Sequence, residues 1–515
     1  MNRTIGAFRS RWLIPALSLL MLLTLILPAH ARQGTASTTF ERWYVVNMGG
    51  EPAGYLHAQE SVENGNLVDR TQMVIEIRRG ELSLKIEMNT RFVETPDGKP
   101  IEAVNVQKLS QMTATTTLKF HPDKIIITTE QGQQKTERSV LPPTQPWMTP
   151  VAMARYIADE LAAGKKQIKT WSIEASLGPE PFETTLNVLG KEVVPVMGRR
   201  VEATVLETSS SRMPGVTSRV YADEQGRAVK MKMGMGGIEL EVVQADKAIA
   251  QTPINPPQLL ASMLITPKGK IESPRQLRQG VYELKIGTMP DGSAVPLPEA
   301  FLPRGSYQKV VWSDDSTVRV VVDLNQPVEP GKDLPTEADR APSPMLNSND
   351  PRVKQLASQA LKNVPADASP AVKAEALRKF VYQYISKKDL SVGFASASEV
   401  ARDGKGDCTE HAVLLAALLR TQGLASRTVS GLVYADNFEG HDDIFGYHMW
   451  TRVWIPGSDS QGGSWIDLDA TLSSDHPFDA THIALGISDL SQGVIANDML
   501  VLAPVMGRLQ IEVVR

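Results

Sequence analysis

Apolar and polar residues alternate along much of the first 250 residues of the chain. Between residues 82 and 88 every second position is apolar, and the same alternation returns at 229–233 and 238–242. Successive side chains of a strand point to opposite faces, so this pattern places one face on a core and the other in water. One amphipathic helix is expected over 150–163. We therefore predict an antiparallel β domain over 40–250, with a sheet that curves around that helix.

The next part of the chain is rich in proline at both ends. Residues 251–267 are typical of a linker, and residues 326–344 combine prolines with acidic residues in the same way. Between them, residues 270–325 end in an apolar run at 317–322 that is typical of a strand. We predict a small β unit with proline-rich linkers over 251–345.

From residue 350 the apolar positions follow a helical period. Asp350-Pro351 and Ser369-Pro370 are helix starts, and Ser396 to Glu399 is a capping box. A buried helix follows Cys408 and is expected to end near Gly423. Strands are predicted over 428–434, 448–455 and 465–469. The C-terminal region over 350–515 is thus predicted to be an α+β domain, and the whole chain to be multidomain.

The N-terminus has the layout of an export signal. Arg3, Arg9 and Arg11 precede an apolar run over 13–27, and Ala29-His30-Ala31 is a small-x-small cleavage site. The apolar run is shorter than the roughly 20 residues that span a bilayer comfortably. We predict a signal peptide over 1–31 and an exported protein, most simply in a bacterial periplasm. The alternative is an uncleaved membrane anchor over 12–28.

The amino-acid composition of the chain excludes several classes of protein. Hydrophobic residues make up 42% and charged residues 22%, which excludes a wholly disordered, collagen-like or multi-span membrane protein. The formal net charge of −4 argues against a nucleic-acid partner. The chain has 1 cysteine, which excludes an internal disulfide and CxxC-type zinc or redox sites.

Residues with chemical potential gather near that cysteine, Cys408. Five of the 8 histidines lie between 411 and 482. Cys408 follows Gly406-Asp407 and begins a helix, where the helix dipole and unpaired N–H groups favour a reactive thiolate. The alternative is a structural cysteine that packs as a small apolar residue.

A nucleophilic cysteine needs a base, and the base needs a group that orients it. His448 begins one strand, and Asp467 and Asp469 lie on the next strand of a hairpin. The two carboxylates share a face about 6.5 Å apart, so only one can hold the imidazole directly. The spacing alone leaves both aspartates open.

Three blocks of sequence, 406–412, 445–450 and 465–471, resemble the transglutaminase-like superfamily in the same order. The resemblance covers about 350–515 and implies a papain-like α+β fold with a transglutaminase core. It implies that Cys408 is the nucleophile and His448 the base. Because the family's aspartate precedes a small residue and a threonine, it selects Asp469. The tail over 481–514 also resembles bacterial members, in which it completes the sheet.

The resemblance implies acyl transfer on amide bonds through a thioester, ending in hydrolysis or transamidation. The expected substrate is a protein or peptide, cell-wall peptides included, and no cofactor or metal is required. Residues expected beside the triad are Asp407, His411, Tyr447, Trp450 and Asp467. Family members without activity exist, so the rival reading is a catalytically inactive envelope scaffold or binding protein. Two further alternatives stay open. One is a Cys408–His411 metal site, and the other is that the polar loop at 441–443 forms a lid and is not simply a solvated loop.

Overall fold

The structure of the protein is a computed structural model. It describes residues 37–79, 82–109, 112–131, 134–176, 178–235, 238–258, 264–287, 302–303, 305–314, 316–328, 333–387, 395–438, 440–457, 462–490 and 507–515. The predicted signal peptide over 1–31 lies outside these residues. Within them, no helix combines the length and apolar character needed to cross a membrane.

The N-terminal region forms one large antiparallel sheet, which confirms the predicted fold class. Within the described residues the sheet has 14 strands in the order β8-β7-β6-β5-β4-β3-β2-β1-β14-β13-β12-β11-β10-β9. Its two halves join where Trp43 of β1 lies opposite Ala245 of β14. The strands are β1 (Ser37–Met48), β2 (Glu51–Glu63), β3 (Asn66–Arg79), β4 (Leu82–Glu94), β5 (Pro100–Leu109), β6 (Met112–Phe120), β7 (Ile125–Gln131), β8 (Gln134–Val140), β9 (Gln167–Glu174), β10 (Gly178–Val196), β11 (Arg199–Ser210), β12 (Met213–Ala222), β13 (Ala228–Met235) and β14 (Ile238–Ala245).

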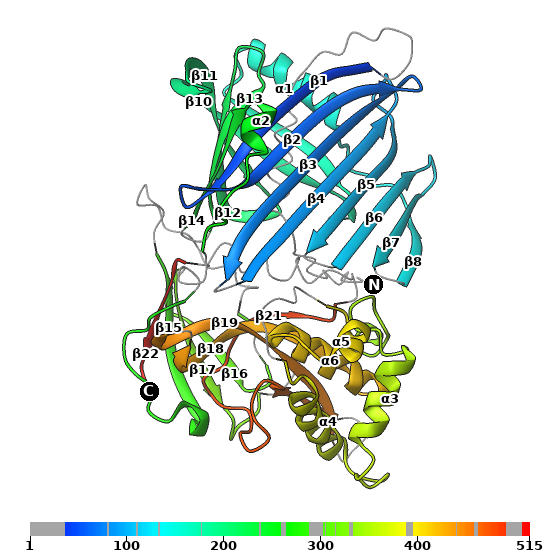
Figure 1. Cartoon of the computed structure of the whole chain (residues 1–515), viewed down its shortest axis with the longest axis vertical. Helices are drawn as coiled ribbons and strands as arrows, with labels where there is room; N and C mark the ends of the chain where they lie inside the picture. The colour runs from blue at the N-terminus through cyan, green and yellow to red at the C-terminus, as the bar shows by residue number, and fades with distance from the viewer. Residues whose placement is uncertain are drawn as a thin grey trace, which may run out of the picture.

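This sheet is strongly curved (Figure 1). The predicted helix is present as α1 (Pro150–Ala162), and it buries Met153, Ala154 and Ile157 in one core with the apolar face of the sheet. The alternating apolar residues Met73 and Met88, which lie opposite each other on β3 and β4, belong to that core. The short helix α2 (Lys247–Ala250) follows the last strand.

A second sheet has the order β16-β17-β15-β22. Its last strand corrects one expectation, because the tail was expected to complete the sheet of the transglutaminase-like region. Only β21 does so, whereas β22 pairs antiparallel with β15, where Val513 lies opposite Tyr282. The elements are η3 (Pro274–Gln276), β15 (Gln279–Ile286), β16 (Gln308–Trp312), β17 (Thr317–Asp323), η5 (Glu337–Asp339) and β22 (Leu509–Val513).

Local capping fixes the helices of the C-terminal region. The Asp350 carboxylate accepts the N–H of Arg352 at 2.8 Å, and Ser369 caps the next helix. Ser396 and Glu399 form the predicted capping box, whose reciprocal bonds satisfy the first free N–H groups of the helix. The predicted helix starts are therefore confirmed. The helices are α3 (Pro351–Ala360), α4 (Pro370–Tyr384), α5 (Ala397–Asp403) and α6 (Cys408–Thr421).

The third sheet has the order β20-β19-β18-β21, and α6 packs on it. The predicted loop at 441–443 is wrong, because these residues begin β19 and His441 lies opposite Phe438 across the hairpin. The second and third sheets bury their apolar residues in one common core. The strands are β18 (Ser426–Phe438), β19 (His441–Pro456), β20 (Gly463–Leu468) and β21 (Ile483–Ser488).

The large sheet sits on the C-terminal half of the molecule (Figure 1). The N–H of Arg78 donates to the carbonyl of Pro257 at 2.8 Å. Ile86 of β4 packs against the helical core, and the Gln131 amide contacts Met345 of the same core. The large sheet therefore contacts the linker at Pro257 and the helical core of the C-terminal region.

Candidate active site

Cys408 is the first residue of α6, and the residue before it caps the helix. The Asp407 carboxylate accepts the N–H and the hydroxyl of Thr409, both at 2.8 Å. Glu410 completes a capping box by accepting the N–H of Asp407 at 2.9 Å. This holds a partly buried thiol at the positive end of a helix that is otherwise almost wholly buried, a setting that stabilises thiolate.

The turn before Cys408 requires a glycine. Gly406 has a φ of 150°, and a Cβ at this position would lie 2.3 Å from Cβ of Glu410. Glu410 is fully buried and also accepts the N–H of Ala395 at 3.0 Å. Burial, and after it the Asp407 carboxylate, raises the pKa of Glu410 well above its usual range. The helix start is thus built from buried polar contacts that leave no room for a side chain.

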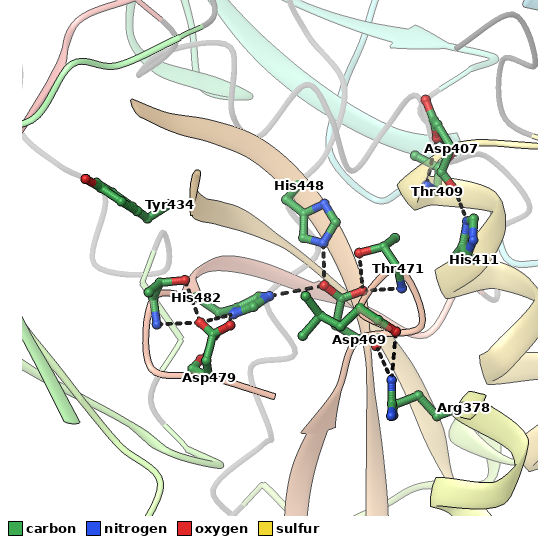
Figure 2. Close-up of polar contacts among 12 residues, drawn as sticks. Arg378, Asp407, Thr409, His411, Tyr434, His448, Asp469, Thr471, Asp479 and His482 are labelled. Carbon is green, nitrogen blue, oxygen red and sulfur yellow. Dashed lines mark hydrogen bonds and ion pairs between the residues drawn. The ribbon is translucent and has the colours of Figure 1, made fainter. Parts of the chain in front are cut away.

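His448 lies on β19, the strand on which α6 packs, and its ring is held by one carboxylate (Figure 2). Its Nε2 donates to Oδ2 of Asp469 at 2.8 Å. Asp469 follows directly after β20, and both side chains are buried or nearly so. A bond from Thr451 Oγ1 to the Ala412 carbonyl, at 3.0 Å, fixes β19 against α6, three residues beyond His448 and one turn beyond Cys408.

Asp469 is held on all sides. Its Oδ1 accepts the N–H and the hydroxyl of Thr471 at 2.7 and 2.8 Å. The buried guanidinium of Arg378 donates to the backbone carbonyls of Asp469 and Leu472 at 3.3 and 3.0 Å, and so fixes the loop that carries the carboxylate. A second imidazole, that of His482, donates from Nε2 to Oδ2 of Asp469 at 3.2 Å. The carboxylate therefore has four hydrogen bonds.

The two imidazoles beside Asp469 determine the charge of its carboxyl group. Burial alone would raise the pKa of Asp469, but the charge and hydrogen bond of His448, together with those of His482, outweigh it. The pKa of Asp469 is held well below its usual range. Asp469 is accordingly a carboxylate, able to orient the His448 ring and to stabilise its protonated form.

The structure gives the neighbouring Asp467 a different partner. Asp467 lies opposite Arg452 in the β19–β20 ladder, and the two form a bidentate ion pair at 2.7 and 3.0 Å. Both side chains are buried. The hairpin register places Asp467 four residues along β19 from His448, which is why it does not reach the imidazole.

The other residues expected beside the triad are packing and support groups. Trp450 is buried and stacks near the His448 ring with centroids 6.2 Å apart. The Tyr447 hydroxyl is also buried, and burial raises the pKa of this group. His411 is buried one turn into α6 and its Nδ1 donates to the Asp407 carbonyl at 2.5 Å, which supports the helix start.

One set of residues offers metal-ligand chemistry. His448, Asp469 and His482 present donor atoms within 4.8 Å of one another. Direct hydrogen bonds at 2.8 and 3.2 Å account for that spacing without an ion. Within the described part of the chain, Cys408 and His411 are not in such a set.

The sequence did not predict the contacts of four residues that hold Asp469 or its partner His482: Arg378, Thr471, Asp479 and His482. One signal was present in the sequence, because Asp-Ala-Thr occurs twice, at 469–471 and 479–481. In both copies the threonine N–H and hydroxyl donate to Oδ1 of the aspartate. The repeat marks two fixed carboxylates, whereas Arg378 has no comparable local signal.

Comparison with known sequences places the C-terminal region. Residues 354–470 match the model of the Transglutaminase-like superfamily. Uncharacterized proteins of Mycobacterium bovis and Mycobacterium tuberculosis are 35% identical to this chain over 92 residues. That alignment covers 17% of this chain and 28% of the mycobacterial proteins, so the chain spans less than a third of their length.

Two of the solved structures that match show distant likeness. A beta-barrel-like protein from Brucella abortus is 15% identical with a TM-score of 0.32, over 40% of this chain and 95% of that one. A candidate cysteine protease from Cytophaga hutchinsonii is 13% identical with a TM-score of 0.25, over 48% of this chain and 82% of that one. Family membership therefore rests on the matched sequence: residues 354–470 of this chain are a domain of the Transglutaminase-like superfamily.

Proposed function

We propose that the protein is an exported enzyme that transfers acyl groups from amide bonds of proteins or peptides, through a thioester on Cys408. The observation that carries this proposal is the fixed Asp469–His448 pair on the strand beside the helix that Cys408 begins. The superfamily match supports the same chemistry. Water or an amine completes the reaction by attack on the thioester.

The roles of the residues follow from their bonds. Asp469 takes Nε2 of His448, so Nδ1 is the atom that exchanges a proton with the thiol. The thiolate attacks the amide carbonyl carbon, and backbone N–H groups at the start of α6 stabilise the oxyanion that forms. The C–N bond then breaks, and His448 gives its proton to the leaving amine.

In the second half of the reaction the thioester is cleaved, and His448 acts first as a base and then as an acid. Water or a second amine attacks the carbonyl carbon while His448 accepts its proton. The C–S bond breaks, and the sulfur regains the proton from His448. Asp469 stays ionised throughout and stabilises the imidazolium in both halves of the reaction. Cell-wall peptides suit the predicted compartment as substrates.

Thiol reactivity tests this proposal without knowledge of the substrate. We expect iodoacetamide at pH 6 to alkylate Cys408 faster than free cysteine, and a His448→Gln variant to lose that advantage. His476→Gln is the matched control, because its ring bonds Ser473 at 2.7 Å and lies outside the triad. Labelling of the intact protein no faster than free cysteine would contradict the proposal and favour the scaffold reading.

A further inference from the structure

His482 is a second histidine on the carboxylate of the proposed triad. It lies in the segment that leads into β21 and bonds the same oxygen of Asp469 as His448 does, from another direction (Figure 2). The ring is fully buried, and its centroid lies 5.8 Å from that of His448. Phe478 and Trp450 enclose it at centroid distances of 4.3 and 5.2 Å. The proposed mechanism gives this residue no role.

Both nitrogens of the ring face acceptors. Nε2 donates to Oδ2 of Asp469 at 3.2 Å, and Nδ1 lies 3.2 Å from Oδ1 and 3.1 Å from the backbone carbonyl of Asp479. A neutral imidazole has only one N–H, so this arrangement is fully satisfied only by the doubly protonated ring. Burial lowers the pKa of His482, but Asp479 and Asp469 outweigh it and raise the pKa to about 9.

The charges around His482 alternate in sign. Asp479 accepts Nη1 of Arg275 at 2.8 Å, and the pKa of Asp479 is lowered because its cationic partners outweigh burial. The sequence His448, Asp469, His482, Asp479, Arg275 thus runs from the triad toward a partly exposed guanidinium. A cation that lies between two carboxylates in a buried site balances charge that water cannot screen.

The second sheet fixes the backbone on both sides of His482. Tyr282 donates to the carbonyl of Ala480 at 2.7 Å, and the N–H of Ala480 donates to Leu277 at 2.9 Å. The Gln308 amide bonds both backbone groups of Ala484, at 2.8 and 2.9 Å. The position of this histidine is therefore set by residues far from the superfamily match.

We propose that His482 is a positioning residue that is protonated at working pH. It fixes the Asp469 carboxylate and balances part of its negative charge independently of His448. This role rests on the proposed function, because it acts through the triad. Removing the cation leaves the full charge of Asp469 to hold the proton of His448. The upper pH at which the alkylation rate of the Cys408–His448 pair changes then moves upward.

The pH profile of Cys408 alkylation between pH 5 and 10 is the test. In His482→Gln we expect the upper inflection of the pH profile to rise by roughly one to two pH units. This magnitude follows from the loss of one positive charge 5.8 Å from the His448 ring. Asp479→Asn should move it in the same direction by less, and His476→Gln should leave it in place. A lower rate at an unchanged inflection would show a merely structural role and overturn the proposal.

Histidine ¹⁵N NMR of the full-length protein separates this inference from the proposed function. We expect one buried histidine, lost in His482→Gln, to carry protons on both ring nitrogens at pH 7.5. If Cys408 labels like free cysteine while that signal is present, the catalytic proposal fails and the assigned charge of His482 stands. A singly protonated His482, or metal removed by EDTA in equal amount to protein, would overturn the inference itself.

Discussion

The substitutions Asp467→Asn and Asp469→Asn can be compared directly, because each removes one negative charge and changes the side chain in the same way. Asp469→Asn removes an acceptor of His448 and favours the wrong tautomer of its ring. An ordinary thiol, with a pKa of about 8.5, is about 0.3% thiolate at pH 6, so alkylation should slow by as much as roughly 300-fold. Asp467→Asn should leave this rate nearly unchanged.

Stability should respond in the opposite order. Asp467→Asn strands the guanidinium of Arg452, which is fully buried and has one nitrogen, Nη1, already without a hydrogen-bond partner. Breaking a buried pair on one side costs about 3–5 kcal/mol of the free energy of unfolding. For a unit of 150–250 residues, that loss lowers the melting temperature by roughly 10 °C. Calorimetry measures this directly.

A double variant completes the comparison. Arg452→Met with Asp467→Leu replaces the pair by apolar side chains, and we expect it to recover most of the lost stability. The rate of Cys408 alkylation at pH 6 is measured for each variant, well below its melting temperature. The reasoning would be refuted if Asp467→Asn slowed alkylation as much as Asp469→Asn and left the melting temperature unchanged.

Three further predictions concern other parts of the structure. Gly406→Ala places a Cβ 2.3 Å from Cβ of Glu410, so thiol alkylation and the melting temperature should both fall, as mass spectrometry and calorimetry would show. Arg378→Met should cost about 2–4 kcal/mol in urea unfolding and slow alkylation, because its bonds fix the loop of Asp469; unchanged kinetics would contradict that role. Burial raises the pKa of Glu60 to about 7, so the folded state retains a proton that the unfolded chain loses. The free energy of unfolding should therefore fall by roughly 3 kcal/mol from about pH 4.5 to 7, and Glu60→Gln should flatten this dependence.

Local signals in the sequence predicted local structure well. Asp350, Ser369 and Ser396 begin helices because a side chain and its own backbone neighbours make the cap. Apolar alternation likewise predicted the buried face of the strands at 82–88, 229–233 and 238–242. It contains no information about partners, so the pairing of β1 with β14, almost 200 residues away, could not be derived.

The same limit applies to the site. The resemblance selected Asp469, but the reason that Asp467 is unsuited lies in the hairpin register that places it opposite Arg452. His482 was visible as a histidine in the tail, yet its contact with Asp469 depends on β21 pairing with β18. The pairing of β22 with β15 was missed for the same reason, because nothing local distinguishes one sheet edge from another.

The central claim is that Cys408 carries an acyl group from an amide bond. We propose to incubate envelope extracts in H₂¹⁸O with a labelled primary amine, using the full-length protein and a Cys408→Ala variant. Mass spectrometry should find new ¹⁸O-labelled carboxyl groups or amine adducts only with the intact protein. Identical products with both proteins, or none with either across the extracts, would contradict the account.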